Sequence, residues 1–144
     1  MKLLKTIRTA LIATSLGLFA QVSTAEMVVV VSAKNPLAAL TEDQVANIFL
    51  GRTSFSMSGE DAVPVDLGED TAARTQFYRQ VTGKSGAQLK AYWSKLIFTG
   101  QAQPPREVTD PAALKKLLDS RPAAIGYMDK NDVDASVKVV LTLH

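Results

Sequence analysis

Met27-Val28-Val29-Val30-Val31 is an unbroken run of apolar residues near the amino end of the chain, and four of the five are β-branched valines. A run without polar alternation is typical of a strand buried on both faces, as in the middle of a sheet covered by helices. Asn35-Pro36 ends the run, and helical patterns follow it. The segment therefore predicts an α/β architecture, with helices packed on a sheet.

The residues after this run predict three more strands and four helices. Capping-box patterns at Thr41 and Ser85, each with Gln three residues later, mark two helix starts. The strands are expected over 63–67, 123–128 and 137–143, and the helices after Thr41, over 71–81, over 86–98 and after Asp110-Pro111. We expect loops over 52–61 and 100–109, where Pro104-Pro105 opposes regular structure. The predicted order is β-α-β-α-α-α-β-β in one domain.

The first 25 residues have the features of a cleavable signal peptide. Lys2, Lys5 and Arg8 precede an apolar stretch over 10–20, and small residues end at Ala25. The stretch is shorter than the roughly 20 residues that span a bilayer, which disfavours the alternative of a membrane anchor. The sequence predicts a leader over 1–25, a domain over 26–144, periplasmic localisation and no membrane insertion after cleavage.

Composition excludes several classes of function. Three of the 16 basic residues and none of the 14 acidic ones lie in the leader, so the mature domain has 13 basic and 14 acidic residues. A nearly neutral domain without a basic run argues against nucleic acid as a partner. The chain has no cysteine, and its single histidine is the last residue, His144. Thiol nucleophiles, histidine triads and multi-histidine metal sites are therefore not expected, and we predict a non-enzymatic protein without metal or cofactor.

Several stretches, taken in order, carry a family resemblance. They are Leu40-Thr41, Ile48-Phe49-Leu50-Gly51-Arg52-Thr53, Phe77-Tyr78, Trp93 and Pro122-Ala123-Ala124-Ile125-Gly126-Tyr127. Together they resemble the phosphate-type periplasmic substrate-binding proteins, which have the type II periplasmic-binding-protein fold. The resemblance implies a mixed sheet flanked by helices and a role linked to phosphate ABC transport. Because full members have two lobes, 119 mature residues imply a single-lobe short form.

The sequence departs from the family at the expected anion site. Members carry an Arg, an Asp and a Gly-Ser-Gly-Thr run after the strand that corresponds to 63–67. This chain reads Asp66-Leu67-Gly68-Glu69-Asp70-Thr71-Ala72-Ala73-Arg74 there. Only Thr71 can replace a hydroxyl donor, and Arg74 is basic but displaced.

The helix that begins near Thr71 is nevertheless the candidate site for an anion. A helix amino terminus has unpaired N–H groups and a partial positive charge, so Thr71 and Ala72 would offer the donors and Arg74 a charge-assisted bond. Ser32 and Asn35, after the first strand, are expected to contribute from a neighbouring loop. In the alternative, Asp70 caps the helix and Arg74 pairs with Glu69 or Asp70. A third interpretation is a site for a cation or a basic partner.

These observations lead to two hypotheses about function. The first is a periplasmic solute-binding or sensing protein for phosphate or a related oxyanion, in which a second copy or a protein partner supplies the other wall. The alternative is an envelope interaction or sensing module that kept the fold and lost the ligand; the missing Gly-Ser-Gly-Thr run favours it.

Overall fold

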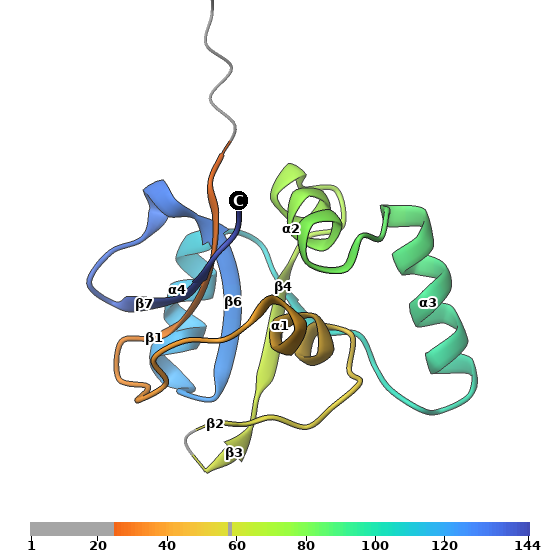
Figure 1. Ribbon diagram of the computed structural model, residues 1–144, viewed down its shortest axis with the longest axis horizontal. Coiled ribbons are helices and arrows are strands. Elements are labelled where there is room, and N and C mark those ends of the chain that lie inside the picture. The colour runs from red at the N-terminus through yellow and green to blue at the C-terminus, as the bar shows by residue number, and fades with distance from the viewer. Residues whose placement is uncertain (1–24, 58) are drawn as a thin grey trace, which may run out of the picture.

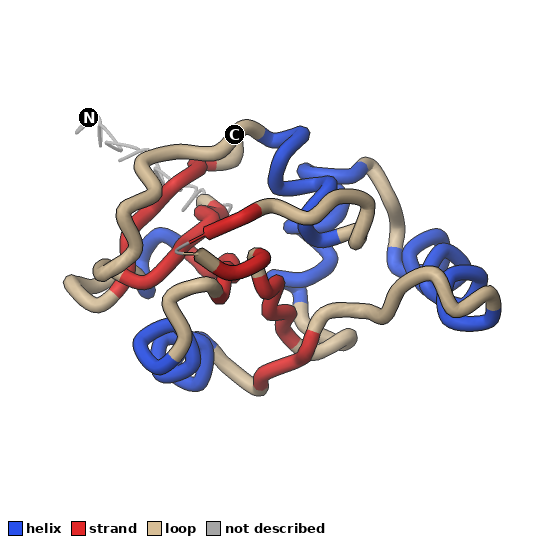
Figure 2. Tube along the Cα trace, turned by 90° about the horizontal axis from the view of Figure 1, so that it is seen from below, coloured by secondary structure: helices blue, strands red, loops and turns tan. Residues whose placement is uncertain are grey.

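The computed structural model describes residues 25–57 and 59–144 (Figures 1 and 2). A five-stranded sheet, in the order β5-β4-β6-β1-β7, forms the centre of the molecule. Its strands are β1 (Met27–Ser32), β4 (Val63–Leu67), β5 (Arg106–Val108), β6 (Ala124–Asp129) and β7 (Val137–Thr142). The helices are α1 (Glu42–Phe49), α2 (Ala72–Thr82), α3 (Gly86–Phe98) and α4 (Pro111–Ser120), with a short 3₁₀ turn η1 (Lys130–Asp132). The α/β prediction is confirmed; the leader, apart from Ala25, lies outside the described residues.

The sheet is mixed, as predicted. β1 runs antiparallel to β6 and β7, whereas β4 runs parallel to β5 and β6. Val30 pairs with Gly126 in the middle of the sheet. The carboxyl end of β1 therefore lies beside the amino ends of β4 and β6. The turn into α2 follows the carboxyl end of β4, at the other end of the strands.

Two expected loops contain short strands, so the predicted element order was incomplete. Arg106–Val108 forms β5, because Pro104-Pro105 ends just before it and its three residues pair with Val65–Leu67 of β4. Within 52–61, β2 (Ser56–Met57) and β3 (Glu60–Asp61) form a small antiparallel hairpin. Both strands are fixed by pairing with another segment, which local sequence patterns do not report.

Helices cover both faces of the sheet and enclose two apolar cores. One core joins α1, α2 and α3 to Val29, Val31 and Tyr127, and the other joins α4 to Val28 and Val30. The valines of β1 thus alternate between the two cores, and all are buried. The run that opened the sequence argument is a strand covered on both faces, as predicted.

The helix ends follow the predicted caps. Both capping boxes are present, at Thr41 with Gln44 and at Ser85 with Gln88. Asp110 caps α4, and its side chain accepts from the N–H of Ala113 at 2.8 Å. None of the helices in the described ranges is long and apolar enough to cross a membrane.

Gly126 allows α4 to lie directly on the sheet. A Cβ at this position would be 2.5 Å from Cδ1 of Leu114, closer than any real contact. The glycine of the Ala-Ile-Gly-Tyr stretch is therefore required by packing against the helix.

Candidate functional site

The turn from β4 into α2 is built on a buried carboxylate, that of Asp66. Only 1% of this residue is exposed. Oδ2 accepts from the Tyr78 hydroxyl at 2.7 Å and from Arg74 Nε at 3.2 Å. Oδ1 accepts from the Tyr127 hydroxyl and from the N–H of Leu67. A buried charge is tolerated only when it is paired and hydrogen-bonded, and these four donors provide both conditions.

The environment keeps the two tyrosines protonated. Burial raises the pKa of Tyr78 and of Tyr127 well above the ordinary value, and the negative charge of Asp66 raises both further. Both hydroxyls therefore act as donors to Asp66. The ring of Tyr127 also stacks on Phe77, with centroids 3.9 Å apart and planes 6° apart. The first two turns of α2 are thereby fixed to the sheet.

Arg74 is held at the edge of this cluster. Its side chain is 12% exposed and lies over the ring of Tyr78, 5.2 Å from the centroid. Burial acts to lower the pKa of Arg74, but the charge and hydrogen bond of Asp66 outweigh it and raise that pKa overall. Only Nε bonds to Asp66, and the Nη groups have no hydrogen-bond partner among the described residues. Their donors remain available to a ligand.

Thr71 is the N-cap of α2, so the helix begins at Ala72, one residue later than predicted. Its Oγ1 accepts from the N–H of Arg74 at 3.3 Å and donates to the carbonyl of Gly68 at 2.8 Å. The hydroxyl proton is therefore already in use. The N–H groups of Ala72 and Ala73, in the first turn, lack intrahelical partners because no carbonyl lies four residues before them in the helix. The donors that this end can offer are backbone amides.

The alternative pairing of this turn was wrong in both parts. The cap is Thr71 rather than Asp70, and Arg74 bonds to Asp66 rather than to Glu69 or Asp70. Position 66 lies in a strand whose side chains alternate, so its carboxylate points inward to Arg74, whereas 69 and 70 lie in the exposed turn. An ion pair between residues eight positions apart, such as Asp66 and Arg74, depends on the tertiary fold and was not visible in the sequence.

Ser32 and Asn35 are not brought together with Thr71. They follow the carboxyl end of β1. Because β1 is antiparallel to β6, this end lies at the opposite end of the strands from Thr71 (Figure 1). The Ser32 hydroxyl accepts from the N–H of Lys34 at 3.2 Å. Asn35 donates to the carbonyl of Pro122 at 2.8 Å and accepts from the N–H of Leu37 at 2.8 Å. Both residues are buried and fix a turn.

A cleft of about 210 Å³ opens beside the first turn of α2; we call it the α2–α3 cleft. Its lining residues are Glu69, Arg74, Gly86, Lys90, Trp93, Ser94, Ile97, Pro104 and Glu107. Trp93 is 5% exposed, and its indole Nε1–H is buried without a partner among the described residues. The cleft thus combines two cations and two exposed carboxylates, and Trp93 forms part of its wall.

Lys90, Trp93 and Glu107 were not predicted as site residues. Trp93 belongs to the predicted apolar stripe of α3, and it is indeed buried in the core. Alternation within β5 directs Glu107 to this cleft and its neighbours to the other face, but that strand was expected to be a loop. No group of side chains suited to holding a metal ion occurs within 25–57 and 59–144.

Comparison with known proteins identifies the fold. No family model and no curated protein matches the sequence. Among solved structures, a protein from Clostridium perfringens, assigned as a phosphate ABC transporter substrate-binding protein and containing bound phosphate, is similar at TM-score 0.62 and 22% identity. An ABC-type phosphate transport receptor from Vibrio cholerae is similar at TM-score 0.62 and 20% identity, and PstS from Borrelia burgdorferi at 0.56 and 13%.

Each of these matches covers 81% of this chain but only 44%, 45% and 48% of the other protein, respectively. The matched part of the chain thus corresponds to less than half of each neighbour. The chain therefore shares the α/β fold of the matched part of these phosphate transport proteins.

Proposed function

We propose that this protein binds an oxyanion of the phosphate class at the α2–α3 cleft, as a non-enzymatic solute-binding protein. The observation that carries the proposal is the placement of Arg74: Asp66 holds its Nε, and the Nη groups remain without a partner at the edge of the cleft. The amides of the α2 amino terminus lie in the same turn. A neighbour of the same fold contains bound phosphate, which supports this ligand class.

The nearby acids weaken the site. Glu69, Asp70 and Glu107 are exposed, whereas Arg74 is largely buried. A unit charge about 4 Å away contributes about 1 kcal/mol in water and about 4 kcal/mol where solvent is partly excluded. The attraction by Arg74 therefore exceeds the repulsion by any one exposed acid, although Asp66 offsets part of it.

The expected affinity is low for the isolated lobe. A cleft open to solvent provides only one wall, and a net binding free energy of about −4 kcal/mol corresponds to a Kd of about 1 mM. Tight binding then requires a second wall, which a second copy or a protein partner would supply. We further propose that the chain is exported, cleaved after Ala25 and active in the periplasm.

Calorimetric titration of the mature domain with phosphate and with sulfate tests the binding proposal. Millimolar binding that is lost in Arg74→Gln supports it, while Arg79→Gln, an exposed arginine on the same helix, is the matched control and should bind normally. No heat at millimolar anion, with the fold intact by circular dichroism, contradicts it.

A further inference from the structure

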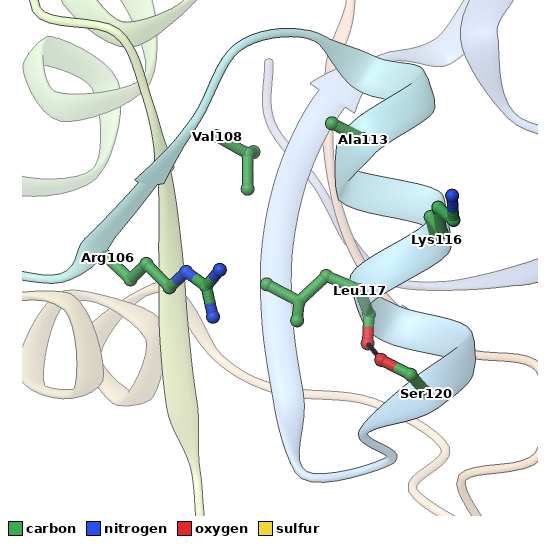
Figure 3. A pocket seen from close by; sticks show the side chains of 6 residues that line it. All are labelled: Arg106, Val108, Ala113, Lys116, Leu117 and Ser120. Carbon is green, nitrogen blue, oxygen red and sulfur yellow. Dashed lines mark hydrogen bonds between the residues drawn. The ribbon is translucent and has the colours of Figure 1, made fainter.

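A second depression lies on the opposite face of the sheet, between the edge strand β5 and α4. It has a volume of about 340 Å³ and we call it the β5–α4 groove. Its lining residues are Arg106, Val108, Ala113, Lys116, Leu117 and Ser120, all shown in Figure 3. α4 lies over β6 and β1, and β5 extends beyond it to the edge of the sheet.

The floor of the groove is apolar and continuous with the core. Val108 and Leu117 are partly buried and pack against the core cluster of Val28, Val30 and Leu114. The one side-chain hydroxyl in the lining, on Ser120, is already bonded to the carbonyl of Leu117 at 2.9 Å. The floor therefore offers an apolar surface without side-chain hydrogen-bonding groups of its own.

The rim of the groove is basic. Arg106 and Lys116 are exposed, and neither forms an ion pair within the described ranges. By contrast, Lys115, the neighbour of Lys116 on α4, pairs with Asp134 at 2.9 Å. No acidic side chain lines the groove. Both unpaired cations belong to the lining of the groove, and Figure 3 shows Arg106 extending from β5 toward Leu117 and Lys116 on the outer side of α4.

One wall of the groove is a strand with a free edge. β5 pairs with β4 alone, and no other described strand bonds to it. Alternation along β5 places Arg106 and Val108 in this groove and Glu107 in the α2–α3 cleft on the other face. A strand added to this edge would lie beside both the apolar floor and the two cations.

We propose that the β5–α4 groove binds an extended segment of a partner protein, paired to the free edge of β5, whose groove-facing residues, at every second position, are in turn apolar and acidic. Apolar side chains of the segment would cover Val108 and Leu117, and its carboxylates would meet Arg106 and Lys116. The charges disfavour two other occupants. The first is the predicted leader, which is basic like the rim of the groove. The second is another copy of the chain, inserting the exposed apolar end of α3 at Phe98; Lys95 lies next to Phe98 and would bring like charges together.

The test uses the fluorescent heptapeptide Val-Thr-Glu-Thr-Val-Thr-Glu, which presents valine and glutamate on one face of a strand, and its counterpart with lysine in place of glutamate, added to the full mature domain. We expect the acidic peptide to bind and the lysine peptide to bind at least about tenfold more weakly, with affinity falling as salt is raised. Arg106→Glu with Lys116→Glu should reverse this preference. Lys95→Glu, an exposed lysine on α3, is the matched control and should leave it unchanged.

Amide signals locate the bound peptide. Binding should shift the N–H signals of residues 106–108 and slow their hydrogen exchange, and a peptide N-methylated on alternate residues should not bind. Three results would overturn the proposal: equal binding of the two peptides, shifts confined to other surfaces, or no binding at millimolar peptide. Binding of decanoate at these residues without binding of the acidic peptide would also overturn it and assign the groove to an amphipathic small molecule.

Discussion

Asp66→Asn should be among the most destabilising substitutions in the domain. Each carboxylate oxygen of Asp66 accepts from two donors. Asparagine replaces one oxygen with an NH₂ group that faces donors, and it removes the charge that balances Arg74. Breaking a buried ion pair by removing one partner costs about 3–5 kcal/mol, a large share of the about 5–15 kcal/mol that stabilises a typical domain.

Removing the other partner should cost a similar amount. Arg74→Gln leaves the buried charge of Asp66 without its cation, so we expect a loss of about 3–5 kcal/mol, although three donors to the carboxylate remain. The double variant should lose less unfolding free energy than the sum of the two single losses, because the second substitution removes a group that the first has already left unpaired. Asp70→Asn, an exposed carboxylate in the same turn, is the matched control and should change stability by less than about 0.5 kcal/mol.

Urea unfolding followed by the fluorescence of Trp93, the one tryptophan of the chain, measures these losses. Should Asp66→Asn not fold, Tyr78→Phe removes a single donor and should cost about 1 kcal/mol. A loss below about 1 kcal/mol for Asp66→Asn, or strict additivity with Arg74→Gln, would refute the interpretation of Asp66 as the centre of the turn.

Three further predictions concern stability. The free energy of unfolding should fall above pH 10, because tyrosines in the unfolded chain ionise there while Tyr78 and Tyr127 in the folded domain keep their protons. Each tyrosine contributes a slope of about 1.4 kcal/mol per pH unit. Urea titrations at high pH should show that Tyr78→Phe removes the contribution of Tyr78 to this slope. Gly126→Ala should lower stability by about 1–3 kcal/mol through overlap with Leu114, and adding Leu114→Ala should relieve that overlap, as measured by a double-mutant cycle. Thr71→Ala should cost about 1 kcal/mol and Thr71→Ser much less, because serine keeps the cap; thermal unfolding compares them.

The strands and helices that have strong local signals could be predicted from the sequence. The valine run gave a doubly buried strand, and Thr41, Ser85 and Asp110 marked helix starts correctly, because capping depends on residues three positions apart. β5 could not be predicted, because a three-residue strand next to two prolines forms only by pairing with β4.

The candidate site was predicted only in part. Thr71 and Arg74 lie at the first turn of α2, as expected, because a cap and a neighbouring cation are local features. The contact by which Asp66 holds Arg74 in place was not predicted, since it depends on the strand alternation that turns Asp66 inward. Ser32 and Asn35 were assigned to the same edge of the sheet, but strand direction depends on the whole topology and places them at the other edge.

The indole N–H signal of Trp93 gives the most direct test of oxyanion binding at the α2–α3 cleft. Because the chain has one tryptophan, the mature domain gives one such signal in a nitrogen–proton correlation spectrum. Titration with phosphate should shift it together with the amides of Ala72 and Ala73, saturating at millimolar anion, and Arg74→Gln should abolish the shift. A signal that stays in place, or that moves equally in Arg74→Gln, would contradict the account.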